Sequence, residues 1–226
     1  MDTSEQIDRL IAEVLQIIPS VTSGRGSFNT MPELGYTARH PGEWQREFLS
    51  VVDGDYLAAL RPDTDLILGL VRLVNQSALA GVPPSDVSFE TLSSVVGYVV
   101  LEMLIRRVTP AIDEWGYLVQ PVEGLKLDRR VSALRDVLDA FEETTLLQEL
   151  RRDLQQLNSR MSSEELDRNG RPETLNLYGR IEKGRNLMLH GNLTHSFEGN
   201  LLVLLIDLIV LHAMKHELRQ NRTGSA

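Results

Sequence analysis

Cysteine is absent from this chain of 226 residues, and its absence excludes several kinds of chemistry. Disulfides, thiolate zinc sites and cysteine nucleophiles cannot be built from the sequence. A protein without cross-links suits a reducing compartment, so we expect a cytoplasmic location. The first ten residues, MDTSEQIDRL, are acidic and polar, so we expect neither a signal peptide nor a transit peptide.

Long apolar runs and an excess of positive charge are also missing. The longest apolar run, LLVLLIDLIVL at residues 201–211, is interrupted by Asp207 and is too short to span a bilayer. We therefore expect a buried helix there and no contact with a membrane. The net charge of −9 argues against broad, non-specific binding of nucleic acid, which depends on a basic surface. A local basic site remains compatible with this charge.

Apolar residues recur at helical spacing through most of the chain, and neither a Gly-rich phosphate loop nor an internal repeat is present. We predict an all-α fold. Residues 86–226 are expected to form a helical bundle, preceded by a helical N-terminal region at residues 1–85. Pro19 is expected to end the first helix and to start a long loop, residues 19–42. Further helical regions are predicted at residues 63–80, 128–161, 173–189 and 198–220.

Polar side chains interrupt an apolar helical pattern in EKGRNLMLHGN, residues 182–192. Arg185 and His190 are five residues apart, which is roughly 140° around a straight helix. Gly191 directly follows His190 and predicts that the helix ends there, which would let the histidine turn toward the arginine. Asn186 lies four residues before His190 on the same helical face, so its amide is suited to orient the imidazole.

The residues RNLMLH, 185–190, resemble the Rx4-6H motif of HEPN domains (higher eukaryotes and prokaryotes nucleotide-binding). The resemblance covers roughly residues 88–220 and includes the order of elements: two long helices, a helix with the motif, and a closing helix. It implies a HEPN-like bundle of four to five helices that forms a homodimer, with two motifs meeting in one cleft. Many members of the family are metal-independent endoribonucleases that act as toxins, antiviral effectors or RNA-processing factors.

Carried over to this chain, the resemblance makes Arg185, Asn186 and His190 catalytic and RNA the substrate, with no cofactor and no metal. A histidine can act as base or acid near neutral pH, and an arginine can hold two phosphate oxygens. Further candidates for substrate contact are Lys183, Asn192 and His195. A cognate antitoxin or regulatory protein is an expected partner. Members paired with a nucleotidyltransferase antitoxin have a tyrosine where this chain has Asn192, so neutralisation by tyrosine modification is not expected.

Other interpretations of the sequence remain open. A catalytically inactive HEPN-like module, which binds a nucleotide or a protein as antitoxin, sensor or scaffold, is the alternative function. His212 and His216 have a spacing that could hold a metal ion, although a solvated or interface helix face is the favoured interpretation. Asp207 is expected to pair with an arginine or a histidine from a neighbouring helix, because a buried carboxylate needs a partner.

Overall fold

The computed structural model describes residues 2–22, 41–52, 64–79, 96–105, 134–166, 169–189 and 196–223. Apart from one short hairpin, the regular structure of this part of the chain is helical, so the predicted all-α class is confirmed. The residues 96–105 form a helical segment. The other elements are α1 (Thr3–Thr22), α2 (Pro41–Val51), α3 (Thr64–Leu79), α5 (Leu134–Thr144), α6 (Gln148–Met161), β1 (Ser163–Leu166), β2 (Pro172–Leu175), α7 (Leu177–Leu189) and α8 (Ser196–Thr223).

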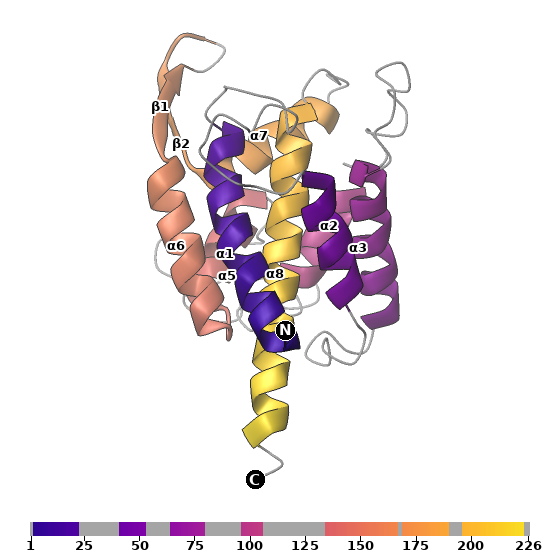
Figure 1. Cartoon of the computed structure of the whole chain (residues 1–226). Coiled ribbons are helices and arrows are strands. Elements are labelled where there is room, and N and C mark those ends of the chain that lie inside the picture. Colours follow the sequence, from indigo (N-terminus) through magenta and orange to yellow (C-terminus); the bar gives the residue numbers. More distant parts are fainter. Residues whose placement is uncertain are drawn as a thin grey trace.

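The last helix, α8, runs through the middle of the fold, and its C-terminal end extends beyond the other helices (Figure 1). It packs against α1, α3, α6 and α7. Residues 201–214 are all buried, as expected for a helix that is apolar on every side. The apolar run at residues 201–211 is therefore a core helix. Among the described helices, none has both the length and the apolar character needed to cross a membrane.

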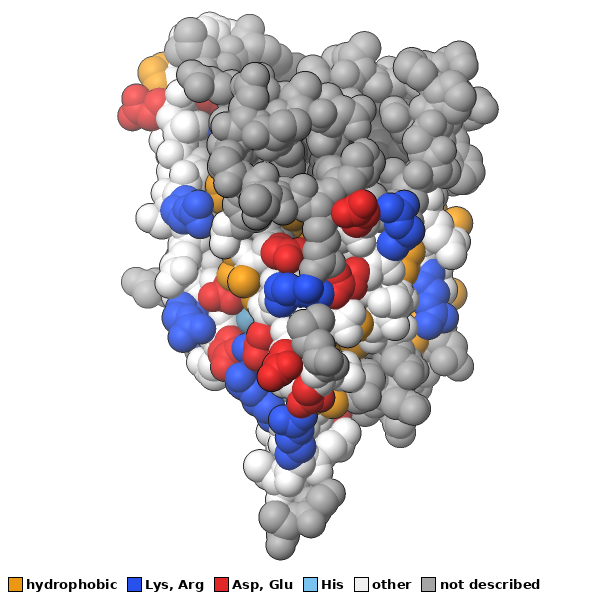
Figure 2. Space-filling model, viewed as in Figure 1, with side chains coloured by type: hydrophobic (Ala, Val, Ile, Leu, Met, Phe, Trp, Pro, Cys, Tyr) orange, Lys and Arg blue, Asp and Glu red, His pale blue; other side chains and the backbone are white. Residues whose placement is uncertain are grey.

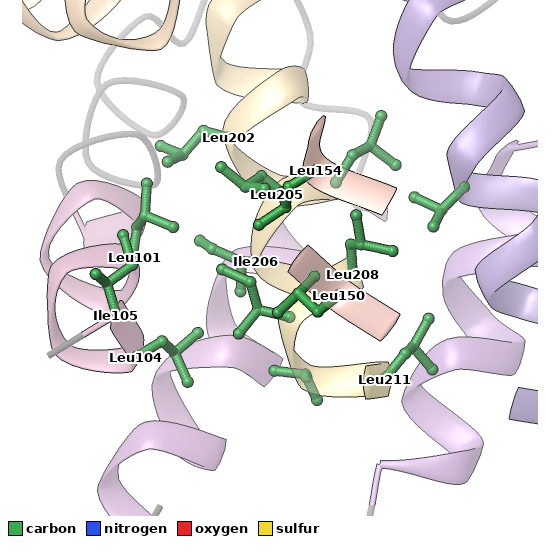
Figure 3. Packing of buried hydrophobic residues seen from close by; sticks show 14 of the residues in the cluster. Leu101, Leu104, Ile105, Leu150, Leu154, Leu202, Leu205, Ile206, Leu208 and Leu211 are labelled. Carbon is green, nitrogen blue, oxygen red and sulfur yellow. The ribbon is translucent and has the colours of Figure 1, made fainter. Parts of the chain in front are cut away.

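Branched aliphatic side chains from three parts of the chain meet along α8 (Figure 3). The labelled ones come from the segment 96–105, α6 and α8: Leu101, Leu104, Ile105, Leu150, Leu154, Leu202, Leu205, Ile206, Leu208 and Leu211. Gly97 lets the segment 96–105 approach α8 closely, because a Cβ at this position would lie 2.8 Å from Cδ2 of Leu202. Residues of α1, α2 and α3 belong to the same core cluster. The proposed boundary at residues 85 and 86 lies outside the described residues.

The prediction that Pro19 ends the first helix is wrong, because α1 continues to Thr22. Proline lacks an N–H group, so the carbonyl of Leu15, four residues earlier, loses its helical hydrogen bond. Arg160 of α6 supplies a replacement donor, since its Nη1 lies 3.5 Å from this oxygen. Ile18 is fully buried, so tertiary packing also holds the last turn. The predicted loop is shorter at both ends; its residues 23–40 lie outside the described residues.

The predicted helical region 128–161 contains a break at residues 145–147, between α5 and α6. Two threonine side chains hydrogen-bond to the backbone at this break. The hydroxyl of Thr144 donates to the carbonyl of Ala140 at 2.6 Å, and Oγ1 of Thr145 accepts from the N–H of Leu147 at 3.3 Å. Such bonds offer the backbone an alternative to the helix, which explains an end that apolar periodicity alone does not indicate.

A β-hairpin occupies residues 163–175. A break between helices was expected only at residues 162–172, and the predicted helix start at residue 173 is wrong, because residues 173–175 belong to β2 and α7 begins at Leu177. β1 and β2 pair antiparallel, with Ser163 opposite Leu175. Gly170 has a φ of 75° and follows Asn169. Asn-Gly is typical of hairpin loops, but only Gly170 of the two has a positive φ here, and residues 167–171 separate the two strands. The dipeptide was therefore a local signal for a turn, although the strands are only four residues long.

Candidate functional site

The first half of the motif lies on α7, which is held in the bundle along its buried face. Asn176 caps its start, since its Oδ1 accepts a hydrogen bond from the N–H of Gly179 at 2.9 Å. Tyr178 and Ile181 are fully buried, and α7 packs against α5, α6 and α8. Arg185 follows Ile181 by one turn and is partly buried, whereas the neighbouring Asn186 is exposed. The arginine thus lies near the C-terminal end of α7, at the edge of the core.

Arg185 forms an ion pair with Glu102, a residue 83 positions earlier in the chain. The distance from Nη2 of Arg185 to Oε1 of Glu102 is 3.5 Å, and the two side chains are 27% and 31% exposed. At this distance the hydrogen bond is weak, and a partly exposed pair adds little stability. The contact nevertheless directs one side of the guanidinium toward the segment 96–105. Arginine has five N–H donors in a planar fork, so the pair occupies only part of its capacity.

A second contact fixes the segment 96–105 against α7 one turn earlier on both helices. The hydroxyl of Tyr98 donates a hydrogen bond to the carbonyl of Ile181 at 3.2 Å, and both residues are buried. Glu102 follows Tyr98 by four residues, and Arg185 follows Ile181 by four. The two contacts are therefore consistent with one shared register. We interpret the buried tyrosine bond as the element that positions the carboxylate beside the arginine.

The other half of the motif cannot be placed, because His190 lies outside the described residues together with Asn192 and His195. The approach of His190 to Arg185 and the orienting role of Asn186 remain predictions. Lys183 is described and is separated from Arg185 by about 200° around the helix. Its Nζ lies 3.7 Å from Glu165 and 4.0 Å from Glu173, both in the hairpin. Contact of Lys183 with a substrate therefore also remains a prediction.

Acidic side chains gather on α5 and α7 near the candidate site. Burial raises the pKa of Asp139 on α5; Arg135 lowers it in part, and Asp136 and Glu182 raise it further. Glu182 lies on α7, three residues before Arg185. The positive charge of the arginine is therefore set in acidic surroundings within the described part of the chain. The described residues around it therefore do not form an extended basic surface.

A partly buried polar cluster connects α5, α6 and α7, and sequence reasoning missed it. Glu142 accepts hydrogen bonds from the hydroxyl of Tyr178 at 2.7 Å and from Nδ2 of Asn158 at 2.5 Å. Burial raises the pKa of Glu142, against the effect of these two donors, and also raises the pKa of Tyr178. No periodic signal marks such a cluster, because its members are 16 and 36 residues away from Glu142.

The histidine pair on α8 is not a solvated face. His212 is only 3% exposed, and its Nε2 lies 3.0 Å from Oδ2 of Asp153 on α6, without the geometry of a hydrogen bond. Lys215 bridges Asp8 of α1 at 2.6 Å and Glu149 of α6 at 2.7 Å. The expected solvated or interface face is therefore wrong for His212, because one turn of α8 carries contacts to two other helices.

A cavity of about 210 Å³ lies beside His212 and Lys215, between the start of α6 and α8. His212, Lys215, His216 and Arg219 contribute to its lining. Hydrogen bonds from Arg219 and Lys215 lower the pKa of Glu149 to about 2, so this acid compensates both cations. Acidic and basic side chains alternate over this part of the surface (Figure 2). Among the described residues, no group of three or more side chains is suited to hold a metal ion.

Asp207 has a different partner from the one predicted. It is fully buried, and its Oδ1 accepts a hydrogen bond from Nδ2 of Asn75 on α3 at 2.8 Å. The expected arginine or histidine is not its partner. The sequence could not indicate Asn75, which is 132 residues away.

Comparison of the chain with family models, with curated proteins and with solved structures gives no match. The likeness to HEPN domains consequently rests on the motif residues and on the order of the helices. The described fold agrees with the coarse expectation of a helical bundle.

Proposed function

We propose that this protein is a metal-independent endoribonuclease of the HEPN type, acting as a toxin or an antiviral defence effector. The observation that carries the proposal is the position of Arg185, which lies on the penultimate turn of α7 beside Glu102 and is partly exposed. A partly exposed guanidinium whose weak contact with one carboxylate occupies only part of its donors is suited to bind a phosphate. Asn186 and His190 complete the proposed site.

The proposed reaction uses the RNA itself as the nucleophile. A base removes the proton of the 2′-hydroxyl, whose oxygen attacks the adjacent phosphorus, and an acid protonates the departing 5′-oxygen. The products are a 2′,3′-cyclic phosphate and a 5′-hydroxyl. His190 is suited to these proton transfers, and Arg185 would stabilise the negative charge that develops on the phosphate oxygens.

Removal of divalent metal ions is expected to leave cleavage intact. Purified protein is incubated with total RNA in an excess of chelator, and the ends of the products are identified. We expect cleavage with cyclic phosphate ends, because arginine and histidine supply the charge and the protons. Activity that disappears with the chelator and returns with magnesium or manganese would contradict this mechanism.

A homodimer is part of the proposal, because one Arg185–His190 pair provides few groups for two proton transfers. We expect sedimentation to show a dimer at micromolar protein concentration. We further expect cleavage to fall with dilution through the range in which the dimer dissociates. Full activity of a protein that sediments as a monomer would exclude a shared cleft.

A binding module without catalysis is the second candidate, and the acidic surroundings of Arg185 favour it. Glu102 compensates the charge of the arginine, and Glu182 lies on the same helix, so bound RNA would meet negative charge on nearby groups. In this case the motif would contact a nucleotide or a partner protein. RNA that stays intact after long incubation with the dimeric protein would support this function over the nuclease.

A further inference from the structure

The contact between Asp207 and Asn75 is the starting point of an inference that does not depend on the proposed nuclease activity. Asp207 lies on α8 within a run of buried apolar residues, and Asn75 lies on α3 and is equally inaccessible to solvent. α3 is at the edge of the fold (Figure 1), and its Leu66 and Leu73 are exposed. The Asn75–Asp207 hydrogen bond is thus a buried polar contact between an edge helix and the central helix.

If Asp207 is ionised, the hydrogen-bond donors and acceptors of Asn75 and Asp207 cannot all be paired. Nδ2 of Asn75 uses its two protons on the carbonyl of Val71, at 3.1 Å, and on Oδ1 of Asp207, at 2.8 Å. Oδ1 of Asn75 and Oδ2 of Asp207 are both buried without a partner. If the nitrogen and oxygen of the Asn75 amide were exchanged, the amide oxygen would face the Val71 carbonyl and Oδ1 of Asp207. The orientation of the amide is therefore fixed. An ionised carboxylate has no proton to offer the remaining amide oxygen.

One added proton would satisfy both of the unpaired atoms. A carboxylic acid has one donor and one acceptor, and so does the facing edge of a carboxamide. We propose that Asp207 is a neutral carboxylic acid in the folded protein, that its proton bonds to Oδ1 of Asn75, and that removal of this proton by base releases α3 from α8. An unpaired buried carboxylate would be costly, whereas the neutral pair leaves neither oxygen unsatisfied.

The electrostatic surroundings of Asp207 agree with this protonation state. Burial raises its pKa well above the ordinary value, and only the hydrogen bond from Asn75 acts in the opposite direction. Among the described residues, no cation and no second acid contributes to the shift. Charged groups on the elements that pack on α8 have other partners: Arg72 with the Val52 carbonyl, Asp8 with Lys215, Arg9 with Glu47, Asp153 with His212, and Glu102 with Arg185.

The direction in which pH affects the docking of α3 follows from the pKa of Asp207 in the docked and in the released state. When α3 is released, Asp207 meets water and has a pKa near its ordinary value of 3.8. Between that value and the raised one, the released state has lost the proton while the docked state retains it. Each unit of rising pH therefore favours release by about tenfold. Below 3.8 docking is unaffected by this group, and above the raised value the effect is constant.

Hydrogen exchange of α3 in the full chain tests whether loss of the Asp207 proton releases this helix from α8. Asp207→Asn is the matched variant. Asparagine has the shape of the protonated acid and carries a permanent donor. As the pH rises from about 5 toward the raised pKa, after correction for intrinsic exchange, we expect protection of residues 64–79 in the wild type to fall about tenfold per unit. In the variant, we expect protection of α3 to be independent of pH across this range.

A direct titration supplies a second measurement that does not depend on how the variant folds. The ¹³Cγ signal of Asp207 in the wild type should remain that of a protonated acid at neutral pH. Either of two results would overturn the proposal. One is a ¹³Cγ titration near the ordinary value, and the other is the same pH dependence of α3 protection in both proteins.

Discussion

Arg185→Ala is expected to lower the rate of RNA cleavage by about a hundredfold or more while leaving the fold intact. Removing a single donor that stabilises transition-state charge typically costs a factor of this size. The stability should change by less than about 1 kcal/mol, because the lost ion pair with Glu102 is partly exposed and its distance is 3.5 Å. Cleavage rates and thermal melts should be measured on the same preparations.

The matched control for this experiment is Arg152→Ala. Arg152 lies on α6 with its side chain 67% exposed, so its replacement removes the same charge away from the motif. His190→Ala should reduce cleavage as strongly as Arg185→Ala, and Asn186→Ala should have an intermediate effect because the histidine remains present. If Arg185→Ala and His190→Ala fold normally and cleave at the wild-type rate, the nuclease proposal is wrong and the binding module is favoured.

Leu205→Ala is expected to destabilise the protein by about 3 kcal/mol. Leu205 is fully buried on α8, near Leu154 of α6 (Figure 3). Truncating a buried leucine removes apolar contacts and leaves a cavity in a close-packed interior, at a typical cost of about 2–5 kcal/mol. For a chain of this size the melting temperature should fall by roughly 6–12 °C. Chemical denaturation should show a lower midpoint with an unchanged slope.

Leu146→Ala makes the same substitution at a surface position and serves as the control. Leu146 lies in the break between α5 and α6 and is 67% exposed. Its truncation should change the free energy of unfolding by no more than about 0.5 kcal/mol. Similar losses for both variants would mean that α8 is not the centre of the core.

Helical periodicity predicted the elements that bury one face or all faces, and it failed where single side chains decide the local structure. The run at residues 201–211 was identifiable as a core helix because its apolar character is nearly continuous. Where α1 extends past Pro19, the carbonyl of Leu15 meets a donor from Arg160, which is 145 residues after Leu15 and which no local pattern contains. The hairpin did have a local signal in Asn169 and Gly170, but its strands were too short for alternation to be recognised.

The candidate site shows the same limit of sequence reasoning. The positions of Arg185 and Asn186 near the end of α7 follow from the apolar spacing around Ile181. The partner Glu102 does not, because the pairing of α7 with the segment 96–105 depends on tertiary packing and on the bond from Tyr98. The predicted partner of Asp207 was wrong for a related reason. The sequence indicates that a buried acid needs compensation, but a proton can provide it as well as a cation can.

The packing of α1 against α8 joins the beginning of the described fold to its end, and it affects how the chain folds during synthesis. The apolar face of α1, which includes Ile7, Leu10 and Val14, is fully buried, and α8 is among the helices that cover it. On the ribosome, α8 is the last of the described helices to be made, on the order of ten to forty seconds after α1 at 5–20 residues per second. Until then α1 lacks its central partner. The nascent chain therefore exposes an aggregation-prone helix during that interval, and we expect it to need a chaperone.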